Sequence, residues 1–401
     1  MGMIINIDQA LELRSDYNIL REPLNEMLKN KQEAWEQNNP IDLLFVRNSI
    51  STFQETYTSS IGFDHAFTET SDMAVGPIFN TAEGFSATYR TRTFQGGFVI
   101  SQQTLEDRQL GKVKDDASQF VKRWHGDVVE YAITAISGGF GKEVTWGSDA
   151  NGGVSRIKLM SADTTDGDIT TPTKNPLFSK SHTIVKRKTM SAADIDAKKQ
   201  SNIFYAPIEI GGSDPGQIAK LADVIYQVIS TMENYYDDNG KIAGVTGAKS
   251  IVTGNNPHLK QALMAAITTD KFGDMPNLAK DIADINCNPY FNLIPQCANG
   301  TGFFIVDKGY NAENHGPEFT ERLAFTLEVT EGKRPKAIYY DGRQRFDINV
   351  ATWRGIAYVM IKNASAVTTD WNYSGNFTEI TPVATLIKPV TVVNIAEGAN
   401  A

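Results

Sequence analysis

Residues 112–138 read KVKDDASQFVKRWHGDVVEYAITAISG, and this stretch decides the fold of the chain. Its apolar side chains recur at spacings of three and four, the period of an amphipathic helix, and Gly138-Gly139 predicts the C-terminal end. At about 1.5 Å per residue the helix would be about 40 Å long, enough to be the spine of a domain. We expect Phe120, Trp124 and Val128 to form the buried stripe of this spine helix, so that Trp124→Ala would give insoluble protein.

Upstream of the helix, residues 61–100 combine many aromatic side chains with Gly, Ser and Thr. The run 87–94, ATYRTRTF, alternates with the period of a strand, which predicts an extended two-stranded ribbon. Such a ribbon is marginal alone, and its aromatic side chains are typical of an interaction surface. We expect it to lie across a neighbouring copy of the chain, with its two arginines meeting carboxylates there. The side chains expected in this contact are Phe79, Phe85, Tyr89, Arg90, Arg92 and Phe94.

The remaining segments predict a mixed α+β protein. Residues 1–60 are expected to be an N-terminal helical arm, with apolar positions at helical spacing over 8–37. Residues 101–212 are expected to hold the spine helix and then a loop-rich excursion, 141–212, whose Thr, Ser, Asp and Gly content indicates the surface.

The second half predicts two further regions and a tail. Region 213–321 contains helices expected at 215–236 and 257–267, with short strands at 250–253, 292–294 and 302–306. Region 322–365 alternates as a block of strands that ends with 356–361. Residues 366–401 form a C-terminal extension with strand-like runs at 384–387 and 390–395.

Composition narrows the classes of function. The chain has 401 residues, 41% hydrophobic and 21% charged, and no run approaches the roughly 18 consecutive apolar residues of a membrane-spanning helix. Its two cysteines cannot form a disulfide framework. Its net charge of −9 disfavours adhesion to a phosphate backbone. It therefore also disfavours the alternative that the ribbon aromatics stack on single-stranded nucleic acid.

No complete catalytic, cofactor or metal motif occurs in the sequence. His182 is the best candidate among five histidines, but no nucleophile elbow accompanies it, and a loop histidine is the simpler interpretation. Cys287 and Cys297 lack the spacing of a zinc site. The acidic run around Gly167 and the run 237–240 lack the glutamate of a calcium loop, so both are expected to be turns. Residues 247–250 lack the first glycine of a phosphate-binding loop and so do not complete that motif.

Four phrases of the sequence, taken in order, are similar to phrases of a known fold. Residues 96–107, GGFVISQQTLED, resemble the passage from the extended loop into the spine helix. Residues 175–182, NPLFSKSH, resemble an "LFS-x-x-H" phrase of the Mu-like and related capsid families. Residues 238–240, 250–253 and 259–262 are similar to a run of the axial domain. Residues 304–307, 345–347 and 353–355 look like the late strands of the fold. Together these four phrases, in this order, resemble the Hong Kong 97-type capsid fold of tailed-phage major capsid proteins and encapsulin shells.

The resemblance implies a shell subunit with no enzymatic activity and no cofactor. Residues 101–212 and 322–365 would form the peripheral domain, 213–321 the axial domain and 61–100 the extended loop. The implied partners are copies of the chain in hexamers and pentamers, together with portal, scaffold or decoration proteins. The shell would enclose double-stranded DNA without reading its sequence, would assemble in the cytoplasm of a bacterial host, and would be part of the virion.

Three alternatives remain open at this point. An encapsulin compartment would share the fold and hold cargo enzymes. A tail sheath or tube protein would form open helical filaments instead of closed shells. A hydrolase that uses His182 would lose its turnover on His182→Ala.

Overall fold

The computed structural model describes residues 39–62, 78, 81–101, 110–147, 155–187, 190–210, 214–333, 336–361 and 378–379. The expected helix over 8–37, the tip of the ribbon including Phe79, and the expected strands at 384–395 lie outside the described residues. The described part is mixed helix and sheet, as predicted.

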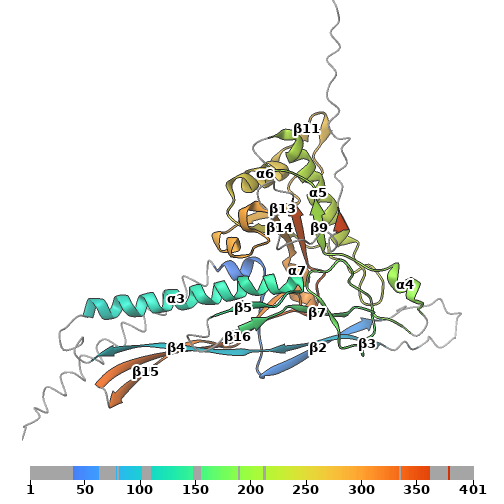
Figure 1. Cartoon of the computed structure of the whole chain (residues 1–401). Helices are drawn as coiled ribbons and strands as arrows, with labels where there is room; N and C mark the ends of the chain where they lie inside the picture. The colour runs from blue at the N-terminus through green and yellow to red at the C-terminus, as the bar shows by residue number, and fades with distance from the viewer. Residues whose placement is uncertain are drawn as a thin grey trace, which may run out of the picture.

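A long sheet forms the base of the molecule (Figure 1). Its order is β1-β15-β16-β4, where β15 and β16 are a hairpin of 16 and 14 residues. The strands of this sheet are β1 (Val46–Ser49), β15 (Glu318–Lys333), β16 (Lys336–Asn349) and β4 (Arg92–Ser101). β4 is antiparallel to β16, with Phe98 opposite Tyr340, and β1 is parallel to β15. Residues of the expected arm, 46–49, therefore belong to the body.

The helix α3 (Leu110–Ser137) lies along this sheet and confirms the predicted spine helix (Figure 1). Its 28 residues correspond to about 42 Å. Its inner stripe, including Ala117 and Val121, packs on Ile100 of β4 and Ile338 of β16. The helix passes at Gly138 into the 3-10 turn η2 (Gly138–Phe140), where a Cβ on Gly138 would meet the carbonyl oxygen of Ile157 at 2.8 Å.

The three side chains expected in the helix core are not equally buried. Val128 is only 4% exposed, whereas Phe120 and Trp124 are half-buried and pack at the margin of the core. The Trp124 indole Nε1 donates to Gln344 Oε1 at 2.8 Å, and its ring lies 4.9 Å from that of Phe325. Trp124 therefore contributes packing and one hydrogen bond across the helix–sheet interface, with one side left open.

Replacing Trp124 by alanine should lower the free energy of unfolding by about 2 kcal/mol, less than the ~3–5 kcal/mol of a fully buried aromatic. The protein should stay soluble, because the rest of the stripe still covers the sheet. Urea unfolding of Trp124→Ala beside Trp124→Phe would measure this. Insoluble Trp124→Ala protein would show that the ring is essential to the core.

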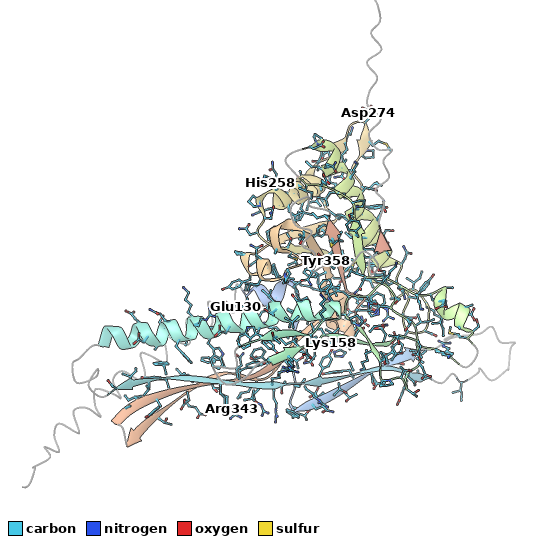
Figure 2. All side chains as sticks on the ribbon, viewed as in Figure 1. Glu130, Lys158, His258, Asp274, Arg343 and Tyr358 are labelled. Carbon is cyan, nitrogen blue, oxygen red and sulfur yellow. The ribbon has the colours of Figure 1, made fainter. Side chains whose placement is uncertain are left out.

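A second body rises from the base and is built on a six-stranded sheet (Figure 1). Its order is β13 (Ala283–Cys287), β10 (Lys249–Thr253), β14 (Gly302–Asp307), β17 (Ile356–Ile361), β9 (Ile203–Ala206) and β18 (Thr378–Glu379). The helices α5 (Pro215–Glu233) and α6 (Pro257–Thr268) begin as predicted, with Asp214 and Asn256 as N-caps followed by proline. Figure 2 places Tyr358 in this sheet and Asp274 at its far tip, near the small hairpin β11 (Lys271–Phe272) and β12 (Met275–Pro276).

The body around the six-stranded sheet includes two segments that were predicted to lie elsewhere. The run 356–361 was expected among the base strands, but as β17 it is a central strand between β14 and β9. Its composition, IAYVMI, is apolar throughout because both of its faces are covered. The second segment is β9, which comes from the predicted excursion 141–212.

The predicted strand at 292–294 is wrong, because the 3-10 helix η4 (Pro289–Leu293) occupies this position.

The excursion is not a surface loop. It contains β5 (Val144–Trp146), β6 (Ser155–Ile157), β7 (Met160–Thr164), β8 (Lys174–Pro176) and α4 (Ala192–Asp196). Leu177, His182 and Ile184 are each 0% exposed, so the expectation of surface exposure is wrong for this part. Polar composition misled the prediction because the polar side chains here bond to one another in the interior. The other described elements are η1 (Pro40–Leu43), η5 (Ala298–Gly300), α7 (Lys308–Asn314) and the ribbon strands given below.

Candidate assembly interface

The predicted ribbon is two different structures joined at Thr91. β2 (Gln54–Gly62) pairs with β3 (Ala82–Arg90) in an antiparallel two-stranded ribbon, with Gln54 opposite Arg90. After Thr91 the chain continues as β4, which pairs with β16 of the base sheet instead. The described part of the two-stranded ribbon is therefore β2 and β3, whereas β4 belongs to the base sheet of the body.

Two of the predicted contacts are buried by the chain itself. Phe85 is 3% exposed and Tyr89 1%, and both pack with Ala162 and Val185 of the excursion. The prediction that these two side chains lie against a neighbouring subunit is wrong. The alternate residues of β3 face inward because the ribbon root lies on the excursion, which the sequence pattern does not reveal.

The arginines and Phe94 also have partners in the same chain. Arg92 Nε lies 2.8 Å from Asp347 Oδ2 and forms an ion pair with it. Burial raises the pKa of the Asp347 carboxyl above its ordinary value. Phe94 stacks on Phe346 with the ring centroids 4.5 Å apart. Arg90 is exposed and donates to Gln54 Oε1 at 3.0 Å. Of the predicted contact residues in the described part, Arg90 is exposed, and Arg92 and Phe94 remain partly exposed.

His315 fastens the root of the ribbon to the body. It ends α7 in the left-handed conformation, with φ 54°, and its ring lies 4.1 Å from that of Tyr57 on β2. Its carbonyl oxygen accepts from the Tyr89 hydroxyl of β3 at 3.2 Å. Its Nδ1 lies 3.0 Å from Glu318 Oε1, and Asn48 Nδ2 donates to the other oxygen of Glu318 at 2.7 Å. Burial raises the pKa of Glu318 above its ordinary value.

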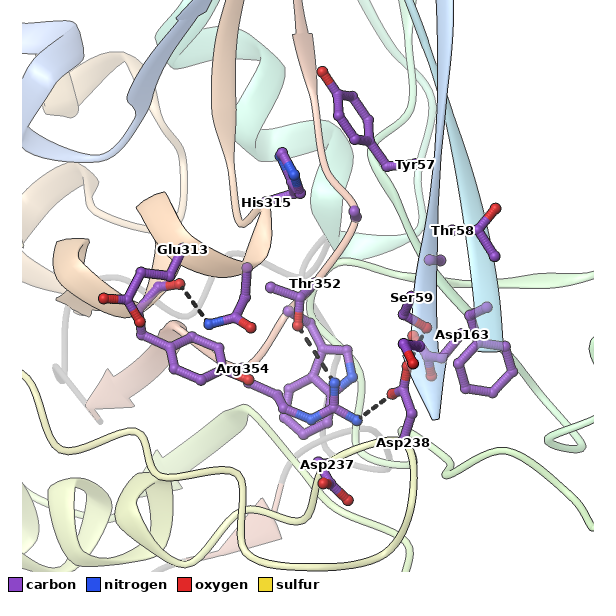
Figure 3. Close-up of a pocket in the computed structure, with 17 residues that line it drawn as sticks. Tyr57, Thr58, Ser59, Asp163, Asp237, Asp238, Glu313, His315, Thr352 and Arg354 are labelled. Atoms are coloured by element: carbon purple, nitrogen blue, oxygen red, sulfur yellow. Dashed lines mark hydrogen bonds and ion pairs between the residues drawn. The ribbon is translucent and has the colours of Figure 1, made fainter. Parts of the chain in front are cut away.

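A second attachment runs through Asp238. Its carboxylate accepts from Ser59 Oγ of β2 at 2.5 Å and from Arg354 Nη2 at 2.7 Å. Arg354 Nε in turn donates to the Tyr236 carbonyl oxygen at 2.6 Å. Figure 3 shows both attachments on the wall of one cavity of about 400 Å³ between the ribbon and the body. The described strands of the ribbon are therefore held to the body by side chains of the same chain.

His315 and Asp238 were not identified from the sequence. The local signals are slight: His315 precedes Gly316-Pro317, which indicates a turn, and Asp238 lies in the turn 237–240. Their partners on the ribbon are more than 170 positions away in sequence, which no local pattern can predict.

His182 is unsuited to catalysis because solvent does not reach it. The side chain is 0% exposed, and its ring stacks on Trp353 with the ring centroids 4.0 Å apart. Nδ1 lies 3.1 Å from Asp163 Oδ2, and Nε2 lies 3.1 Å from Asn202 Oδ1. Both ring nitrogens of His182 therefore have partners inside the protein. His182 is an ordinary hydrogen-bonded histidine, as predicted, but it lies in the core and not in a surface loop.

Asp163 should make stability depend on acid pH. Burial by itself would raise its pKa, but the charge of His182 and hydrogen bonds from His182, Ser161 and Asn175 outweigh burial and lower the pKa below 3.8. A depressed carboxyl pKa adds stability above the unfolded value, about 3.9, which is lost as the pH falls through the folded value.

Asp163→Asn should therefore lower the free energy of unfolding by about 1–3 kcal/mol at neutral pH. The difference in free energy of unfolding between Asp163→Asn and the parent protein should become smaller below about pH 3.8. Urea unfolding of both proteins from pH 7 to pH 3 measures it. A gap that stays constant over this range would contradict the assignment.

The described residues hold no group of three or more His, Cys, Asp or Glu side chains that could bind a metal ion. The acidic run around Gly167 is a turn as predicted, since Asp166 and Asp168 accept from the backbone amides of Asp168 and Thr170. Within the same described residues, no helix is long and apolar enough to cross a membrane.

Solved structures similar to this chain come from phage capsids and a virus-like particle. A structure of Mycobacterium phage Patience matches with a TM-score of 0.43 and 16% identity, covering 88% of this chain and 90% of that one. The mature capsid of bacteriophage PhiM1 matches with 0.44 and 10%, covering 81% and 88%. A virus-like particle from Pyrococcus furiosus matches with 0.40 and 8%, covering 85% and 97%.

No protein-family description matches the sequence. No curated protein matches it in sequence either.

Proposed function

We propose that the chain is the structural subunit of a closed protein shell, the major capsid protein of a tailed phage, with the Hong Kong 97-type arrangement. The observation that carries the proposal is the ribbon. Its root is fixed to the body by Tyr57, Ser59 and Tyr89, and Ile78, which lies between β2 and β3 in the sequence, is 91% exposed. This exposed apolar side chain would be covered if the ribbon lay on another copy.

The two bodies fit the same proposal. The base, with α3 along the sheet β1-β15-β16-β4, corresponds to the peripheral domain, and the body around the six-stranded sheet corresponds to the axial domain. In this arrangement β9 and β17 belong to the axial domain. Hexamers and pentamers would form around the axial domains, and portal, scaffold or decoration proteins would complete the particle.

The charge suits a container for DNA. With a net charge of −9, the subunit would not retain incoming double-stranded DNA through phosphate contacts. The subunit would assemble in the bacterial cytoplasm and end in the virion, and it would act by position alone, with no catalytic step.

Electron microscopy and analytical ultracentrifugation of the purified protein test the proposal. We expect closed shells of uniform diameter. Open tubes would indicate a tail protein, closed shells isolated from the source with an enzyme inside would indicate an encapsulin, and a monomer at all concentrations and salt conditions would refute shell formation by this chain alone.

A further inference from the structure

A groove runs between the spine helix α3 and the edge strand β4, and we call it the spine groove. Its volume is about 810 Å³. The aromatic side chains that line it are Phe94, Phe120, Trp124, Tyr131, Trp146 and Phe346. Tyr131 and Phe346 are buried at its base, whereas the other four remain partly exposed. It is therefore an open aromatic surface and not a closed cavity.

The groove is shaped by both of its walls. On the strand side, the Trp124 ring packs beside the backbone of β4, since a Cβ built on Gly96 would lie in ordinary van der Waals contact with the ring, at 3.4 Å. On the helix side, Arg123 lies 2.8 Å from Asp127 and 3.4 Å from Glu130, and forms a polar rim. Figure 2 shows Glu130 on this helix above the sheet. An apolar floor under a polar rim suits an amphipathic segment.

We propose that the N-terminal segment of the same chain, residues 1–38, docks in the spine groove. The chain enters the described structure at Asn39 and turns at once into η1, which packs against α3 (Figure 1). Ile41 and Leu44 of this entry are buried, so the point of departure is held beside the helix. Even as a helix, 38 residues would reach about 57 Å, more than the length of α3.

The sequence of this segment fits the floor of the groove. Leu13, Leu20, Leu24 and Leu28 recur at helical spacing among Glu, Lys and Gln. The other segments outside the described residues fit less well. Residues 148–154, SDANGGV, adjoin the groove but carry little apolar surface, and residues 380–401 depart from β18 in the other body.

Photo-crosslinking of the full chain tests the docking directly. p-Benzoylphenylalanine replaces Arg123, which is exposed and lines the groove from the side of α3. A matched control carries it at Thr326, an exposed residue of β15 beside the inward-packed Phe325. After irradiation, mass spectrometry should find position 123 joined to peptides of residues 1–38 in the monomer band, with no such product from position 326.

Several outcomes would overturn the proposal. They are crosslinks to residues 63–81, to residues 148–154 or to residues 380–401, crosslinks to residues 1–38 only in a dimer band, and no crosslink at all.

Tryptophan fluorescence gives an independent readout. In a Trp35→Phe background, deletion of residues 1–38 should shift the emission to longer wavelength and increase acrylamide quenching, because Trp124 and Trp146 become more exposed. Leu20→Asp and Leu24→Asp together should reproduce the shift, and an unchanged spectrum would contradict docking. Shell assembly is scored separately, so the docking can fail while the shell proposal stands, and the reverse.

Discussion

Lys249→Met should lower the free energy of unfolding by about 3–5 kcal/mol, the cost of leaving one partner of a buried ion pair alone. Lys249 Nζ lies 2.8 Å from Asp307 Oδ2 across the paired strands β10 and β14, with the side chains 2% and 0% exposed. The same ammonium donates to the carbonyl oxygens of Val245 and Gly247 at 2.9 and 2.8 Å. Because whole domains are stable by about 5–15 kcal/mol, this one change removes a large share.

The control for this prediction separates lost charge pairing from lost packing. Combining Lys249→Met with Asp307→Asn should recover part of the lost free energy of unfolding, because asparagine leaves no unpaired charge in the core. The asparagine side-chain oxygen can still accept from the Tyr310 backbone amide, as Asp307 does. Lys260→Met, at an exposed position of α6, should change stability by less than about 0.5 kcal/mol. Urea unfolding measures all three. If Lys249→Met matches the parent, Asp307 is compensated by another group.

Two deletions in the ribbon should have opposite consequences. Replacing residues 64–80 by a short Gly-Ser linker removes the far end but keeps β2, β3 and their attachments. We expect a soluble subunit with the circular dichroism of the parent that does not close shells. Replacing residues 68–93 removes Phe85 and Tyr89 from the core and Arg92 from Asp347, so this chain should misfold or aggregate.

Circular dichroism and solubility measure whether each deletion variant folds, and electron microscopy measures whether it forms shells. Normal shells from the 64–80 deletion would show that the ribbon end is dispensable for assembly. A folded, soluble 68–93 deletion would show that the side chains of β3 add little to the body, and would restore the view that they serve a neighbour.

Helices were predictable because their determinants are local. The apolar spacing around Phe120 and Val128 and the glycines at 138–139 placed the spine helix within two residues of α3. Asp214-Pro215 placed the start of α5, since cap, proline and the first turn are adjacent in sequence. In each case the period of 3.6 residues carries enough information without knowledge of the partner surface.

The strands show what local sequence omits. Residues 82–101 alternate with little interruption, yet the chain changes partner at Thr91, from β2 on one side to β16 on the other. Strand partners come from distant segments, and the alternation is the same whichever segment pairs with it. For the same reason 356–361 was correctly predicted as a strand and placed in the wrong sheet.

The sequence alone determined the mixed helix and sheet, the spine helix, the starts of α5 and α6 and an acidic, cysteine-poor composition, because these follow from neighbours along the chain and from residue counts. Only the tertiary structure decided where the ribbon divides, that Phe85 and Tyr89 are covered by their own chain, and that His315 and Asp238 hold the ribbon root. Those contacts join residues more than 70 positions apart, and their free energy depends on burial, which exists only once the chain has folded.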